Sequence, residues 1–297
     1  MTGCFICPIY DEGMDFKYGY NLVESAIQFG LISNLYFVFS SVDQKNIFLD
    51  YCVKHYGNTP NALILEQNLS SFRNQVTIKK FFGLRSLMSQ YDYISTIDCE
   101  SVFTQKFEPG HLLDEIWQSE SYLSANICIK GAEILRKCVE TLCIERGELL
   151  ERETKNYRFF WWFNEIPVYR PDTLNDFFQW LEECGRIERV YNDWNCFDYL
   201  VYILWILAFK EKHLHKHRFP ALYGIIEELW EPEVPFKRII ERTMHTHWTS
   251  RTKLRNKEKN IYIQFHLDRR YTRFKQCLER MKLVVDWCLK QFFVKRG

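Results

Sequence analysis

Several common signatures are missing from this 297-residue chain. It has no G-x-x-x-x-G-K-[ST] loop, which excludes a P-loop enzyme, and no G-x-G-x-x-G, which excludes a Rossmann dehydrogenase. The most apolar stretch, residues 199–209, stops at Lys210, well short of the about 20 residues that a bilayer crossing needs. No internal repeat or low-complexity stretch is visible. We therefore expect a folded protein without a transmembrane segment.

An excess of charge of either sign is also missing. With 39 basic and 38 acidic residues, the chain has no general electrostatic reason to bind nucleic acid. The 11 cysteines have irregular spacing, and Cys4-x-x-Cys7 has no second pair downstream, which disfavours a zinc or redox site. Because no signal peptide is visible, we expect reduced, mostly buried thiols in a cytoplasmic protein.

Basic residues gather near the C-terminus, in a run from Arg251 to Arg273. A local surface of this kind suits phosphates, a diphosphate leaving group or anionic lipid heads. Peripheral contact with a membrane therefore stays open, and so does the alternative of a solvated helix face.

The first hundred residues alternate between buried strand and helix patterns. Strands are expected at 3–10, 35–39, 62–65 and 91–97, with helices at 20–29, 44–55 and 77–89 between them. This rhythm predicts an α/β fold with a mostly parallel sheet flanked by helices. The later patterns predict a largely helical second half, with helices at 131–143, 173–183, 196–212, 221–230 and 274–294. We expect an α/β part (1–155) and a helical part (156–297) packed as one compact unit.

Ligands of such sheets bind beyond the carboxyl ends of the strands, where three polar strand ends are expected to meet. The strand at 91–97 leads into Asp98-Cys99-Glu100, whose carboxylates are one residue apart and can face one crevice. Hard oxygen ligands of this kind suit Mn²⁺ or Mg²⁺ beside a diphosphate. Taken alone, the motif is weak, and an exposed acidic turn is the alternative.

The order of elements over about residues 3–130 resembles the nucleotide-binding half of GT-A glycosyltransferases. In that family an Asp-x-Asp motif after such a strand holds the metal and the donor diphosphate, and Asp98-Cys99-Glu100 departs from it only in its second acid. The segment Lys79-Lys80-x-x-Gly83-Leu84 is also similar to small glycosyltransferases of large algal viruses and bacterial surface-glycan clusters. The resemblance implies a GT-A-like fold and transfer of a hexose or pentose, with Mn²⁺ or Mg²⁺, from a UDP-sugar to a glycan or other hydroxyl acceptor.

The resemblance also implies roles for individual residues. In the donor site, Pro8, Tyr10 and Asp11 would lie against base and ribose, and Lys80 or Arg85 would reach ribose or diphosphate. Both basic side chains also suit a solvated helix face. Ser41 at the second strand end and Asp98 complete the donor-binding set.

Metal ligands are expected at Asp98, Glu100 and a later histidine, for which His247 is preferred to His245. The HLHKH segment at 213–217 is interpreted as a polar helix end.

An inverting enzyme needs a carboxylate base for the acceptor hydroxyl, whereas a retaining enzyme does not. Glu165, which follows an aromatic run able to cradle a sugar ring, is the first candidate, and Asp198 is the reserve. Two rival functions remain. A nucleotidyltransferase is disfavoured because the loop at 10–14 has one Gly and no Arg. A non-catalytic anion-binding or membrane-binding protein would explain the basic run but not the acidic strand end.

Overall fold

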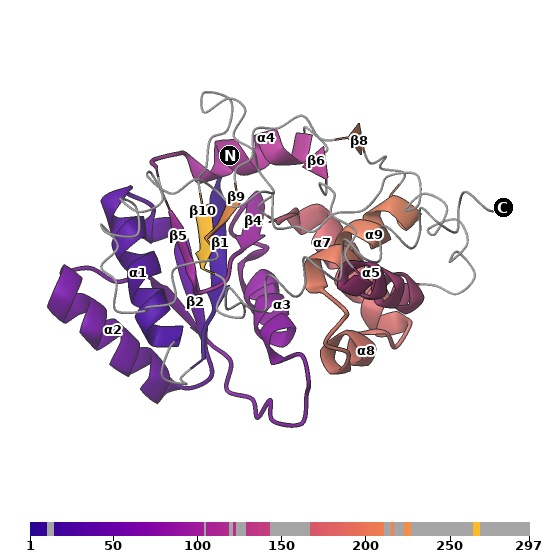
Figure 1. Ribbon diagram of the computed structural model, residues 1–297, viewed down its shortest axis with the longest axis horizontal. Coiled ribbons are helices and arrows are strands. Elements are labelled where there is room, and N and C mark those ends of the chain that lie inside the picture. The colour runs from indigo at the N-terminus through magenta and orange to yellow at the C-terminus, as the bar shows by residue number, and fades with distance from the viewer. Residues whose placement is uncertain are drawn as a thin grey trace, which may run out of the picture.

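The computed structural model describes residues 1–10, 15–103, 105–118, 121–122, 129–142, 167–210, 215–216, 223–226 and 264–267. Its centre is a five-stranded sheet in the order β3-β2-β1-β4-β7 (Figure 1). The first four strands are parallel: β1 (Gly3–Pro8), β2 (Leu35–Phe39), β3 (Asn61–Ile64) and β4 (Tyr93–Thr96). At one edge, β7 (Val168–Tyr169) pairs antiparallel with β4. The predicted α/β class with a mostly parallel sheet is confirmed.

Helices cover both faces of this sheet (Figure 1). One apolar cluster packs α1 (Asp15–Gln28), α2 (Val42–Tyr56) and α4 (Pro109–Gln118) against it. The other packs α3 (Gln75–Leu87), α5 (Ile129–Leu142), α7 (Pro171–Glu183), α8 (Ile187–Asn192) and α9 (Asp198–Phe209). A short 3-10 helix, η1 (Ile32–Asn34), precedes β2. Within the described ranges, no helix combines the length and apolarity needed to cross a bilayer.

Strand β1 shows why this part of the sequence is an uninterrupted apolar run. Phe5 and Cys7 belong to one cluster and Cys4 and Ile6 to the other, and all four are fully buried. A central parallel strand must be apolar on both faces, because helices cover both. Cys4 and Cys7 therefore face opposite sides of the sheet, and both are free thiols. This placement on opposite faces disfavours a shared disulfide or zinc site at this C-x-x-C.

The second helical layer is tied to the loop that precedes α3. The Asn74 side-chain amide donates to the carbonyls of Val190 and Cys196, at 3.2 and 3.1 Å, and the Asn74 backbone N–H donates to the carbonyl of Tyr191. These bonds fix the C-terminal end of α8 and the segment just before α9 against the start of α3, next to the carboxyl edge of the sheet.

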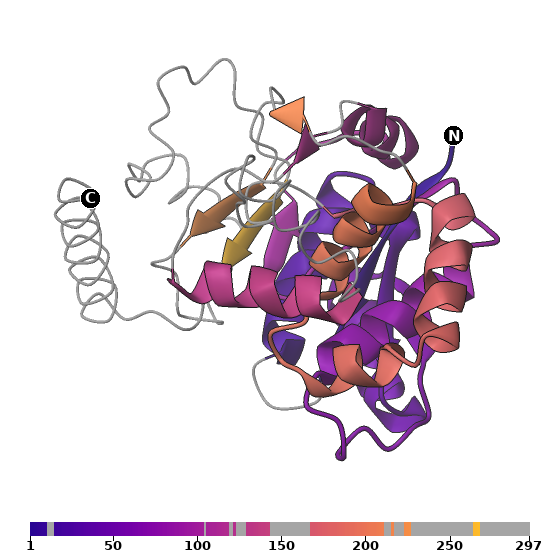
Figure 2. The same ribbon diagram turned by 90° about the vertical axis from the view of Figure 1, so that its right-hand side faces the viewer.

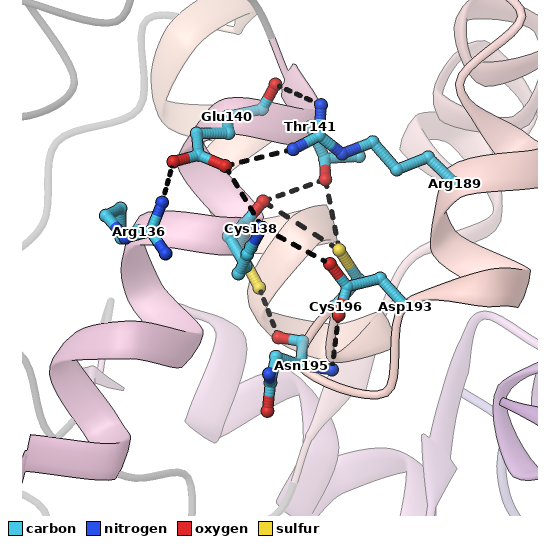
Figure 3. Close-up of polar contacts among 9 residues, drawn as sticks. Arg136, Cys138, Glu140, Thr141, Arg189, Asp193, Asn195 and Cys196 are labelled. Carbon is cyan, nitrogen blue, oxygen red and sulfur yellow. Dashed lines mark hydrogen bonds and ion pairs between the residues drawn. The ribbon is translucent and has the colours of Figure 1, made fainter. Parts of the chain in front are cut away.

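Charged and thiol groups then join α5 to this layer (Figure 3). Glu140 accepts hydrogen bonds from Arg136 on its own helix and from Arg189 on α8, the latter at 3.0 Å. Lys137 lies 3.9 Å from Asp193, and Thr141 Oγ1 lies 3.1 Å from Cys196 Sγ. Because the last two partners lie just before α9, the network holds the approach to that helix.

Two predictions for the second half are wrong. The segment 221–230 was expected to be helical, but β9 (Tyr223–Ile226) is a strand parallel to β10 (Gln264–Leu267). β10 also pairs antiparallel with β5 (Ser101–Phe103), and the views in Figures 1 and 2 place these three strands together. Strand β9 pairs with β10, about 40 residues further on, and β10 in turn pairs with β5, about 160 residues earlier. These distant partners decide that the segment is a strand, and a local apolar pattern does not show them.

The HLHKH segment was expected to be a helix end. Instead, β8 (His215–Lys216) pairs with β6 (Ser121–Tyr122), again through a distant partner. The predicted helix at 274–294 lies outside the described residues.

At Gly83, helix α3 approaches the sheet closely. A Cβ at this position would lie 2.7 Å from Ile6 Cγ2 and 3.2 Å from Val38 Cγ2. A larger residue would therefore push α3 away from β1 and β2. We expect Gly83→Val to lower the free energy of unfolding by about 1–3 kcal/mol, measured by urea denaturation.

The matched control is Lys54→Val, at an exposed position of α2. It introduces the same side chain into a helix without a packing conflict, and its cost should stay below about 1 kcal/mol. Equal destabilisation by the two variants would show that the approach of α3 at Gly83 is not tight.

Candidate functional site

Three chain segments meet at the carboxyl edge of the sheet: the residues after β1, the residues after β4, and the first half of α3. Helix α3 precedes β4 and runs back along the sheet, so its N-terminal half, with Lys79 and Lys80, lies at the edge where the parallel strands end. This is the edge where ligands bind in α/β folds.

Lys80 is the centre of a charged cluster that links this edge to α9. Its Nζ lies 3.2 Å from Asp98 Oδ1 and 3.9 Å from Asp198 Oδ1. The Lys80 side chain is 13% exposed, that of Asp198 only 8%, and that of Asp98 36%. Burial works against the charged ammonium, but Asp198 and Asp98 more than offset it, so the pKa of Lys80 lies above its usual value. Lys80 is thus a fixed cation with one deep and one more accessible carboxylate partner.

The deep carboxylate is held from its other side by β7. Tyr169 donates its hydroxyl hydrogen to Asp198 Oδ2 at 2.7 Å. Tyr169 is fully buried, and its pKa lies well above the usual value because of burial and the adjacent Asp198. Its hydroxyl therefore stays protonated and acts as a donor. Asp198 is also the first residue of α9, where the N-terminal end of the helix dipole favours a negative charge.

The two acids of the predicted metal motif, Asp98 and Glu100, both affect the pKa of a thiol near the end of β1. Cys99, between them, is buried in the core, whereas Asp98 and Glu100 are both partly exposed. Burial is the main cause that raises the pKa of the Cys7 thiol, and Asp98 and Glu100 raise it further. Both carboxylates are therefore close enough to influence one thiol at the sheet edge.

As ligands for a divalent cation, Asp98 and Glu100 fit by chemistry, since both offer hard oxygen donors. Among the residues that the structure describes, however, no group of three or more His, Cys, Asp or Glu side chains is arranged to hold a metal ion. A complete site would need a further ligand beyond these ranges, such as the predicted His247, or substrate oxygens and water. The metal site stays a prediction.

Lys79, the neighbour of Lys80 on α3, reaches the residues that follow β1. Its Nζ donates to the carbonyl oxygen of Ile9 at 2.5 Å and lies 3.9 Å from the centre of the Tyr10 ring. Pro8 ends β1 directly before them. The predicted donor residues Pro8, Tyr10, Lys80 and Asp98 therefore belong to one edge of the sheet.

Ser41 and Arg85 make structural contacts. Ser41 is the N-cap of α2, and its hydroxyl accepts the Gln44 N–H at 3.2 Å. Arg85 pairs with Glu182 of α7 at 2.5 Å and stacks on Phe178. Arg85 lies five residues after Lys80, and five helical steps rotate a side chain by about 140°. The structure brings Lys80, but not Arg85, into the cluster with Asp98.

Several predicted site residues lie outside the described ranges, namely Asp11, Glu165, His245 and His247. The basic run from Arg251 to Arg273 is likewise outside, apart from the backbone of β10. Two contributors to the site were not singled out by the sequence. Lys79 is adjacent to a predicted residue in the Lys-Lys pair, whereas no local signal marks Tyr169, whose role depends on contacts with α9.

Comparison with known proteins gives fold-level similarity only. No protein-family model and no curated protein matches the chain. Among solved structures, it is similar to mouse xyloside xylosyltransferase 1 in its apo form, with a TM-score of 0.41, 7% identity, and coverage of 90% of this chain and 97% of that one. It is also similar to the galactosyltransferase LgtC in complex with donor and acceptor sugar analogues, with a TM-score of 0.39, 11% identity and coverage of 90% and 87%.

A third similarity is to TarS of S. aureus. Residues 1–349 of TarS give a TM-score of 0.36 at 12% identity over 70% of this chain, and a longer TarS structure gives 0.30 at 14% over 43%. The match spans 56% of the shorter TarS chain and 22% of the longer one. At these scores the similarities carry no argument about substrate or reaction, for which the charged cluster itself is the basis.

The cluster predicts that loss of the Asp198 carboxylate destabilises the protein much more than loss of the acid from an exposed Asp–Lys pair. Asp198→Asn keeps the volume of the side chain and an acceptor for Tyr169, but it removes the deep carboxylate partner of the Lys80 ammonium. We expect the free energy of unfolding to fall by about 3 kcal/mol and the pKa of Lys80 to fall as well.

Asp176→Asn is the control, because Asp176 pairs with Lys210 where both side chains are exposed. Its cost should stay below about 1 kcal/mol. Urea denaturation of both variants measures the difference, and a small, equal effect would mean that Asp198 is not needed to balance Lys80.

Proposed function

We propose that this protein is a glycosyltransferase that moves a sugar from a nucleoside-diphosphate sugar, a UDP-sugar in the first instance, to a hydroxyl group of a glycan or other acceptor. The observation that carries the proposal is the Lys80 cation fixed between Asp98 and Asp198 at the carboxyl edge of a parallel sheet. A diphosphate leaving group gains negative charge as the sugar departs, and preorganised positive charge stabilises it.

The two acids after β4 suit a metal ion as a second positive group beside Lys80, because Asp98 and Glu100 offer hard carboxylate oxygens at the carboxyl edge of the sheet. We propose that Asp98 and Glu100 hold Mn²⁺ or Mg²⁺, with His247 as a further ligand. When bound, such an ion supplies a Lewis acid that offsets the charge of the departing diphosphate.

The protein groups would divide the work as follows. The Lys80 ammonium attracts the diphosphate, Asp198 and Asp98 keep that ammonium charged, and Tyr169 holds Asp198 in place. Asp198 has one oxygen bound to Tyr169 and the other facing Lys80, and its side chain is largely buried. This environment suits a positioning role better than proton abstraction from an acceptor. Glu165 is therefore our proposed base for an inverting reaction.

On the nucleoside side, we propose that Pro8, Tyr10 and Asp11 contact the base and ribose. Tyr10 offers an aromatic ring for stacking directly after β1. The acceptor would then approach from the part of the site that Glu165 serves.

Isothermal titration calorimetry with UDP tests the metal and the diphosphate together. We expect wild-type protein to bind UDP more tightly with Mn²⁺ than with EDTA, and Asp98→Asn to reduce the affinity measured with Mn²⁺ by about tenfold or more, equivalent to about 1.4 kcal/mol. The difference between Mn²⁺ and EDTA should shrink in this variant, which separates loss of the metal from loss of the Lys80 partner. Asp176→Asn, remote from the cluster in its contacts, should bind as wild type does.

A panel of nucleotide-sugars with Mn²⁺ tests the reaction itself. We expect slow release of a nucleoside diphosphate from at least one donor, because water can replace the acceptor. If folded wild-type protein binds no nucleoside diphosphate and hydrolyses no donor, the transferase proposal fails and a non-catalytic anion-binding role takes its place.

A further inference from the structure

Lys79 is a buried cation next to the charged cluster, and its described contacts are with the chain after β1. Its side chain is 0% exposed, although its neighbour Lys80 is in contact with the site. Adjacent residues of an α-helix point about 100° apart. Lys80 is directed to the end of β4 and to α9, whereas Lys79 contacts the chain directly after β1.

A buried ammonium requires compensating contacts, because removal from water costs several kcal/mol. Described contacts of Lys79 are with two consecutive residues, the carbonyl oxygen of Ile9 at 2.5 Å and the ring of Tyr10 at 3.9 Å. A hydrogen bond from a charged donor and a cation–π contact are among the stronger polar interactions in proteins. Both act on the segment that leaves the sheet at the predicted nucleoside side of the site.

Ile9 is fixed on its other sides as well. Its N–H donates to the Val38 carbonyl of β2 at 3.2 Å, and its side chain is fully buried against Gly19 of α1, where a Cβ would come within 2.7 Å of Ile9 Cδ1. The Lys79 ammonium holds the remaining polar group of Ile9, its carbonyl. Tyr10 is thus the first residue beyond a rigid anchor.

The ring of Tyr10 is held in turn. Its hydroxyl oxygen is enclosed, and burial, followed by Asp15 and Cys99, raises the pKa of Tyr10 above its usual value. One face of the ring lies against the Lys79 ammonium. Any ligand that stacks on this ring has to use the opposite face.

We propose that Lys79 is the positioning residue of the nucleoside subsite: it fixes Ile9 and Tyr10 and thereby sets the ring face on which the donor base stacks. Lys79 does not touch the ligand. This inference rests on the proposed function for the identity of the ligand. The two adjacent lysines then serve the two halves of one donor, Lys79 the nucleoside through Tyr10 and Lys80 the diphosphate directly.

Lys79→Met tests the proposal, because methionine keeps an unbranched side chain and removes the ammonium. In nucleotide-free protein, hydrogen exchange of the Ile9 amide should rise by about tenfold, since the segment loses its anchor. The affinity for UDP should fall by about tenfold, and the KM for the donor should rise while kcat changes little, because Lys79 acts on donor binding through Tyr10 and does not touch the ligand. Lys54→Met, at an exposed position of α2, is the matched control and should match wild type in all three measurements.

The outcomes separate this proposal from the proposed function. Unchanged exchange at Ile9 in Lys79→Met, or faster exchange with wild-type affinity for UDP, overturns the positioning role. If wild-type protein binds no nucleoside diphosphate but exchange at Ile9 still rises in the variant, the proposed function fails while the anchoring of Tyr10 stands. Lys79→Arg retains a cation and should bind UDP more tightly than Lys79→Met does. A role of Lys79 that depended only on the volume of its side chain would not explain this recovery.

If Lys79→Met does not fold, Tyr10→Leu tests the other partner of the contact. This change removes the aromatic face at a half-buried position and should lower UDP affinity by about tenfold, since stacking on a base contributes on the order of 1–3 kcal/mol. Wild-type affinity in Tyr10→Leu would show that the ring does not receive the base.

Discussion

The interaction on which the site depends is the contact of one lysine with two carboxylates of unequal exposure. Asp198 is buried and Asp98 is more accessible, and Lys80 lies between them. A buried carboxylate or ammonium without its partner is strongly unfavourable. The cluster can therefore form only when α3, the end of β4 and α9 are all docked together. Folding of the helical layer and assembly of the site are in this sense one event.

This dependence explains why polar contacts gather around the start of α9. Asn74 fixes the segment before α9 to the loop before α3, and the network in Figure 3 attaches α5 to the same segment through Lys137, Asp193 and Cys196. The charged pair, Lys137 and Asp193, is partly exposed, and such ion pairs contribute little stability one by one. The common effect of these contacts is geometric, because each limits the position of the helix that begins with Asp198.

The helices and strands of the first hundred residues were predictable because each has its own apolar pattern in the sequence. A central strand such as Gly3–Pro8 must be apolar on both faces, and that requirement is visible as an unbroken run. The same logic located Asp98 at the sheet edge, whereas Lys80 was implied by the resemblance to GT-A enzymes, which did not separate it from Arg85. Tyr169 and the strand at Tyr223–Ile226 could not be found in this way, because their roles depend on partners far along the chain. Asp198 was identified as an acid of interest, but its burial beside Lys80 is a tertiary property.

The neighbouring lysines show how a helix can organise an extended anionic ligand before it arrives. Positive charge that is already fixed needs no reorganisation when a diphosphate gains negative charge, whereas a mobile surface lysine would first lose side-chain entropy. Lys80 meets this condition through Asp98 and Asp198, and Lys79 meets it through Ile9 and Tyr10. Both depend on the position of α3, and Gly83, one turn further on, lets that helix approach the sheet closely. The close packing of α3 is thus a condition for the electrostatics of the site.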